Sequence, residues 1–158
     1  MNGATLRTIR EALGLSVPWF ADFCKVRERT VRYWESGRNA VPADVEHAIL
    51  TLENASTEMA DQLVGKVHAL IDQYGPPKGP IPVERFDTDE DLARFQPNME
   101  GLPVTFHAAA IARARWSLAG EKVEIFARMI DVDAYQAWLD ETGQADSPQL
   151  RSRFLCRE

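Results

Sequence analysis

Residues 6–38 have the sequence LRTIREALGLSVPWFADFCKVRERTVRYWESGR. Apolar side chains recur at helical spacing over residues 4–13, which predicts an amphipathic helix that Gly14 ends. Ser16 can cap a second helix, and Pro18 is tolerated in the first turn of that helix because no N–H partner is needed there. The stretch therefore begins with two short helices in close succession.

A third helix is predicted over residues 28–36, after a short turn at residues 25–26. We expect Val31 and Trp34 on the inner side of this helix and its end at Gly37. Two helices of about eight residues that are joined by a turn of roughly three residues form the layout of a helix-turn-helix unit.

The third helix has an outer face that suits the major groove of DNA. The residues left for this face are Arg27, Glu28, Arg29, Arg32 and Tyr33. An arginine can donate two hydrogen bonds to guanine, and a glutamate can accept one from cytosine. Thr30 and Arg38 suit phosphate groups, whose contacts fix the position of a protein on DNA without selecting the base sequence.

This stretch resembles the Cro/repressor (xenobiotic-response-element, XRE) class of bacterial and phage DNA-binding proteins. The matching positions are Leu6, Ile9-Arg10-Glu11, Gly14-Leu15-Ser16, Phe20-Ala21, Val26, Thr30-Val31 and Trp34-Glu35-Ser36-Gly37-Arg38. The resemblance implies an ion pair between Arg10 and Glu35, which ties the first helix to the third. It also implies contacts to base edges from Glu28, Arg29, Arg32 and Tyr33.

Three positions depart from the pattern of this class. Val17 and Pro18 stand where many members have a glutamine that braces a phosphate or base contact. Lys25 stands where a glycine usually adopts the left-handed conformation, at some cost to the backbone. Lys25 and Arg27 are nevertheless candidates for contacts to the DNA backbone. Trp19 packs either on the sugar–phosphate backbone of DNA or against the protein interior.

Charge is distributed unevenly along the 158 residues, whose net charge is −6. Residues 1–40 carry seven basic and four acidic side chains, whereas residues 41–158 carry eleven basic and twenty acidic ones. A basic first part on an acidic remainder would orient the approach of the chain to a polyanion.

A fourth helical segment begins at Pro42 and extends to residue 74, as one long helix or as two joined near residues 56–57. The sequence GPPKGPIP at residues 75–82 predicts a linker and a domain boundary. We therefore expect an all-α helix-turn-helix domain of four or five helices at residues 1–74. A small α+β domain follows at residues 83–158, so the fold class is α+β.

The second half is predicted to mix strands with short helices. The expected elements are a strand over 81–86, a helix over 87–95 capped by Asp87, a loop over 96–103, a helix over 104–118, a strand over 121–129, a helix from Asp131 or Asp133 to Leu139, and a tail with one possible turn at 150–155. With WESGRNAVPADVEHAIL at residues 34–50, this half is similar to the YdiL-like group of phage and bacterial regulators. That resemblance implies a homodimer formed by the C-terminal half, and some members of the group are autorepressors beside anti-CRISPR genes.

A homodimer is also expected because one helix-turn-helix unit contacts only a few base pairs, whereas two units on a two-fold axis bind a palindromic operator. The apolar residues that could form the dimer interface are Phe106, Trp116, Phe126, Tyr135 and Trp138. The same side chains could instead form the core of the second half. The sequence thus favours a homodimeric, sequence-specific DNA-binding transcription regulator, most simply a repressor.

Catalytic and metal-binding patterns are not evident in the sequence. The three histidines are isolated, Cys24 and Cys156 form no CxxC pair, and no GxSxG motif occurs. We expect no enzyme activity, no cofactor and no metal, and we expect a cytoplasmic protein because no apolar run could span a membrane. Two alternatives remain open: a protein-interaction module that uses the helix-turn-helix as a scaffold, and a binder of structured RNA.

Overall fold

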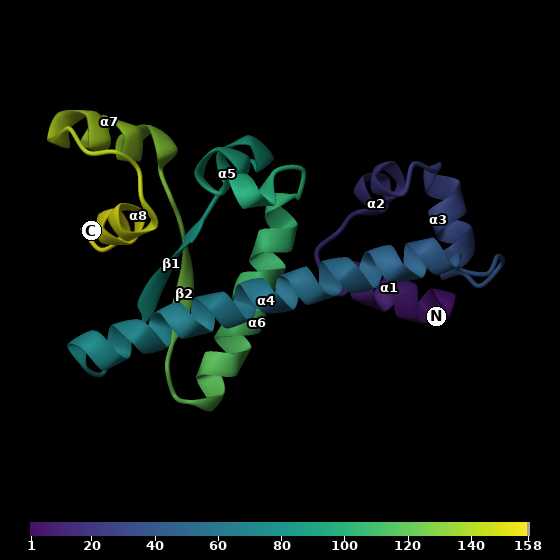
Figure 1. The fold of residues 1–158 in the computed structure, drawn as a ribbon, viewed down its shortest axis with the longest axis horizontal. Helices are drawn as coiled ribbons and strands as arrows, with labels where there is room; N and C mark the ends of the chain where they lie inside the picture. Colours follow the sequence, from purple (N-terminus) through teal and green to yellow (C-terminus); the bar gives the residue numbers. More distant parts are fainter. Residues whose placement is uncertain (158) are drawn as a thin grey trace.

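The structure, a computed structural model, describes residues 1–157. Figure 1 shows the order of the elements along the chain. They are α1 (Gly3–Ala12), α2 (Val17–Phe23), α3 (Glu28–Glu35), α4 (Ala43–Tyr74), β1 (Ile81–Arg85), α5 (Asp89–Phe95), the 3-10 helix η1 (Pro97–Met99), α6 (Val104–Gly120), β2 (Ile125–Met129), α7 (Val132–Thr142) and α8 (Pro148–Leu155). The α+β class is confirmed.

The first three helices begin and end where local chemistry predicts. The Ser16 side chain accepts a hydrogen bond from the Trp19 backbone N–H and so caps α2. Gly14 ends the first helical segment with φ = 69°. Lys25 also adopts a left-handed conformation, with φ = 55°, at the position where a glycine is usual.

Helix α4 is one continuous helix, which settles the choice between one helix and two. It begins at Ala43, so Pro42 is the residue that precedes the helix rather than its first residue. The first half of α4 buries Val45 and Ile49 in a core shared with α1–α3, and its second half buries Val67 against α6. Figure 1 shows α4 running from beneath α3 to the far side of the sheet.

The sheet of the second half consists of the parallel strands β1 and β2, with Ile81 opposite Ile125 and Arg85 opposite Met129. Helix α6 lies in the crossover connection between β1 and β2 and packs across α4 (Figure 1). On the other side, α8 packs against β1.

Several predicted boundaries in this half are wrong. Thr88, not Asp87, caps α5, because its side chain accepts the hydrogen bond from the Asp91 N–H. The predicted loop over 96–103 contains the short helix η1, and the predicted tail forms the two-turn helix α8. Strand β2 begins four residues later than expected, because Glu121 and Lys122 form a turn after α6.

The two halves pack directly against each other. The Thr105 hydroxyl donates a hydrogen bond to the Gly14 carbonyl, and the Trp19 indole N–H donates one to the Gly101 carbonyl. A Cβ atom at Gly14 would lie only 2.5 Å from the Thr105 carbonyl oxygen, so the contact requires glycine there. The division of the chain at residues 75–82 stays a prediction. None of the helices formed by residues 1–157 is both long and apolar enough to cross a membrane.

Candidate nucleic-acid interface

Small and apolar residues fix the angle between α2 and α3. Ala21 is almost fully buried where the two helices meet, and Val31 and Trp34 bury the inner face of α3. A Cβ atom at Gly3 would lie 1.9 Å from the Trp34 carbonyl oxygen, so the start of α1 packs on the end of α3 at a distance that only glycine permits. The orientation of α3 is therefore set by tightly packed contacts on its inner side.

A buried ion pair adds to this restraint. Arg10 Nε and Nη2 donate to the two carboxylate oxygens of Glu35, at 2.5 and 3.2 Å, and Arg10 Nη1 donates to the Leu15 carbonyl at 2.6 Å. Both side chains are more than nine-tenths buried. The structure thus brings together the two residues that the resemblance pairs, and it joins α1, the following turn and the end of α3.

The outer face of α3 is exposed and carries the side chains expected to contact bases. Arg32 forms an ion pair with Glu28 one turn earlier, with 2.8 Å between Nη2 and Oε2. Arg29 is exposed, and no carboxylate of residues 1–157 lies within ion-pair distance of its guanidinium. Tyr33 is half-buried beneath the Arg38 guanidinium, whose carbon lies 4.3 Å from the ring centre. Arg29 is therefore the cation of this helix that is most available to a ligand.

The flanking residues expected to contact phosphates lie around the same face. Lys25 and Arg27 are exposed on the turn before α3, and Arg38 lies just beyond its end. Thr30 is half-buried in the first turn of α3. These residues extend the positive charge on both sides of the helix, which suits a polyanionic backbone.

Trp19 is half-buried and stacks on Phe23, with 5.1 Å between ring centres. Its indole N–H is used in the hydrogen bond to Gly101, so the side chain is oriented toward the second half of the chain. This is the arrangement that the interior alternative describes. A contact of Trp19 with the DNA backbone stays a prediction.

The residues expected at a dimer interface separate into two sets. Phe106 and Tyr135 are fully buried and Trp138 is nearly so, all within the core of one chain. Trp116 is 82% exposed on α6, and Phe126 is 42% exposed on β2. Only this second set is on the surface, together with Met129 of β2, which the sequence reasoning did not select.

A polar cluster between β1 and α8 was also not predicted from the sequence. Arg151 is buried, and its guanidinium binds Glu84 at 2.7 Å and Asp146 at 2.6 Å. Burial lowers the pKa of Arg151, but the hydrogen bonds to Glu84 and Asp146 outweigh that effect and raise it. Burial and the hydrogen bond to Asp146 raise the pKa of the Tyr135 hydroxyl. The contact between Arg151 and Glu84 joins residues 67 positions apart, which no local pattern predicts.

Comparison with known proteins places these observations in context. Residues 3–63 match the family model described as a helix-turn-helix domain. Over 60 residues the chain is 43% identical to the Aca2 repressor of Pectobacterium phage ZF40. The matched segment covers 37% of this chain and 52% of that repressor, so the match spans about half the length of this relative.

Proposed function

We propose, for a chain whose residues 3–63 match the model of a helix-turn-helix domain, that the protein is a DNA-binding transcription regulator that represses by occupying an operator. The observation that carries the proposal is the exposed face of α3, where Arg29 has no carboxylate of residues 1–157 at ion-pair distance, on a helix whose inner side is packed by Val31 and Trp34. The 43% identity to a protein named a repressor also supports this proposed function.

Each residue of the interface has a specific role in this proposal. Arg29 and Arg32 donate to guanine edges, and Glu28 both positions Arg32 and accepts from cytosine. Tyr33 lies under Arg38 and contacts the base next in line. Lys25, Arg27, Thr30 and Arg38 bind phosphates and hold α3 at one depth in the groove.

The regulator acts as a homodimer on a palindromic operator. Two copies would place their α3 helices in successive major grooves, roughly 34 Å apart. The exposed Trp116 and Phe126 are the residues of the expected interface that can reach a second copy. Large exposed aromatic side chains are common at the centres of protein interfaces.

The test is capture of genomic DNA fragments by the purified chain, followed by sequencing. The R29A/R32A variant removes two arginines from α3, and the matched control R115A/R153A removes two exposed arginines from α6 and α8. We expect the wild type and the control to enrich the same palindrome, and R29A/R32A to lose it, since each base contact contributes about 1–3 kcal/mol. Equal enrichment by R29A/R32A would refute the assignment of α3.

The form of the enriched motif tests the homodimer separately. A palindrome with half-sites one helical turn apart supports two copies, whereas a single half-site with a monomeric mass in sedimentation contradicts them. Enrichment of DNA must also fall steeply between low and moderate salt, because phosphate binding releases counterions. Equal or tighter binding to structured RNA would favour the RNA alternative instead.

A further inference from the structure

A cavity of about 600 Å³ lies in the second half of the chain, away from the helix-turn-helix. Its walls are the second half of α4, strand β1, residues 95–98 at the end of α5 and in η1, the start of α6, and helix α8, and most of the lining surface is apolar. Leu63, Val67 and Ile111 are among the apolar lining residues. The volume falls within the range of about 300–1,000 Å³ that is typical of sites for small molecules.

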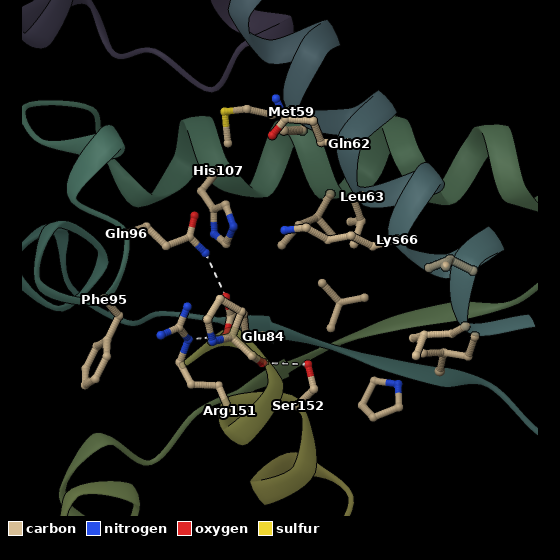
Figure 2. A pocket seen from close by; sticks show the side chains of 18 of the residues that line it. Met59, Gln62, Leu63, Lys66, Glu84, Phe95, Gln96, His107, Arg151 and Ser152 are labelled. Carbon is tan, nitrogen blue, oxygen red and sulfur yellow. Dashed lines mark hydrogen bonds and ion pairs between the residues drawn. The ribbon is translucent and has the colours of Figure 1, made fainter. Parts of the chain in front are cut away.

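His107 is a polar side chain that lines this cavity, on helix α6. It is 94% buried, and its Nδ1 atom is enclosed without a hydrogen bond among the described residues. Figure 2 shows the ring directed from α6 into the cavity. Burial and the nearby Arg85 lower the pKa of His107 to about 4, so the ring is neutral at pH 7. A buried polar group without a hydrogen bond is costly, and because Nδ1 itself is enclosed, a ligand in the cavity would bond to the ring through Nε2.

The charged residues of the cavity favour an anion. Three cations line it, Lys66, Arg151 and Arg153, but Arg151 is already paired with Glu84 in the wall and with Asp146 beside it, which leaves Lys66 and Arg153. Both oxygens of Glu84 are already used, one by Arg151 at 2.7 Å and one by the Gln96 amide at 2.8 Å (Figure 2).

Lys66 is the cation most available to a ligand. It is exposed on α4, and within residues 1–157 no carboxylate lies at ion-pair distance from its ammonium group. Figure 2 shows its side chain extending toward His107. A positive excess at an apolar cavity is unexpected in residues 41–158, which carry nine more acidic than basic side chains.

We propose that this cavity binds a small organic acid, with its carboxylate between Lys66 and His107 and its apolar chain against Leu63, Val67 and Ile111. The carboxylate forms an ion pair with the Lys66 ammonium and accepts a hydrogen bond from the neutral His107 ring. The apolar chain is removed from water by the walls of α4 and α6. The site is separate from the DNA-binding face, so the proposal that it binds an acid can be tested independently of the function proposed above.

The test uses octanoate as the probe and octan-1-ol as the neutral molecule of equal chain length, with binding to the full chain measured by calorimetry. The variant K66M removes the cation proposed to bind the carboxylate, and the control K78M removes an exposed lysine in the segment before β1. We expect saturable binding of octanoate to the wild type and to K78M. We expect K66M to weaken the binding of octanoate about five- to tenfold, because one charge-assisted contact is lost, and to leave the binding of octan-1-ol unchanged.

A second variant addresses the imidazole. H107F keeps a ring of similar size in the wall and removes its hydrogen-bonding nitrogen atoms, and its thermal unfolding is followed to establish that it folds. We expect H107F to weaken the binding of octanoate more than the binding of octan-1-ol.

Two results would overturn the proposal. One is the absence of saturable octanoate binding to the folded wild type, and the other is equal binding to K66M, K78M and wild type. If octanoate does not bind and K66M or H107F dissociates a dimer in sedimentation, the cavity receives a second copy of the chain instead of a small acid.

Discussion

Removal of Arg10 tests whether the ion pair with Glu35 holds α3 in place. The R10M variant keeps most of the apolar volume of the side chain but removes two hydrogen bonds to Glu35 and one to Leu15. The Glu35 carboxylate, whose side chain is 9% exposed, then remains buried without its cation. Loss of one partner of a buried ion pair costs about 3–5 kcal/mol, and we expect the free energy of unfolding to fall by that amount.

The double variant R10M/E35L makes the prediction sharper. It leaves neither charge unpaired, so its free energy of unfolding should lie within about 1 kcal/mol of the wild type, well above that of R10M. The control R7M breaks the exposed ion pair between Arg7 and Glu11 on the same helix and should leave stability nearly unchanged. Urea unfolding followed by circular dichroism measures all four proteins. An R10M cost below about 1 kcal/mol, or a double variant no more stable than R10M, would refute the reasoning.

Three further predictions concern single residues. Between pH 7 and pH 5 the free energy of unfolding of the wild type should fall by about 2 kcal/mol more than that of H107F. The pKa of His107 is about 4 in the folded chain and near 6.5 when unfolded, so the unfolded state binds more protons in this range and stability falls as pH falls. Parallel pH dependences of urea unfolding for the two proteins would contradict this prediction. G14A should lower the free energy of unfolding by at least about 1–2 kcal/mol, because its φ of 69° is left-handed and a Cβ would meet the Thr105 carbonyl, and an unchanged melting temperature would count against it. G65A should instead raise the free energy of unfolding by about 0.5–1 kcal/mol, because a Cβ at this position of α4 meets no atom within 4 Å; destabilisation in urea would exclude this reading.

The helix-turn-helix could be predicted from the sequence because its signals are local. Ser16 caps α2 within three residues, and Gly14 and Gly37 end the segments before the next helix with positive φ. The apolar spacing of α3 placed Val31 and Trp34 on the inner face, where the structure buries them. In such short elements the backbone conformation is set by side chains that lie only a few residues away in sequence.

The second half was less predictable because tertiary contacts decide its details. Two adjacent residues, Asp87 and Thr88, can each cap a helix, and the residue pattern alone does not show that Thr88 is the cap. Arg151 pairs with Glu84, which lies 67 residues earlier, and the sequence does not distinguish these two charged residues from those on the surface. Apolar character alone likewise could not separate the buried Tyr135 from the exposed Trp116.

The cavity was unpredictable for a related reason. Its walls come from several elements between α4 and α8, and its most informative member, His107, looked like an isolated histidine. An unpaired imidazole becomes visible only when the surrounding side chains are in place. Sequence patterns report which residues are apolar, but they do not report where packing leaves a space.

The continuity of α4 limits how the chain can change in length. Its 32 residues span about 48 Å, and each insertion or deletion would shift one end by about 1.5 Å and rotate it by about 100° relative to the other. Because Val45 and Val67 are buried near opposite ends, such a rotation would turn one of the two apolar stripes toward water. Changes of about seven or eleven residues, close to two or three whole turns, would nearly restore the phase. Related chains should therefore vary in length in the segment between α4 and β1, and α4 should keep its length or change by nearly whole numbers of turns.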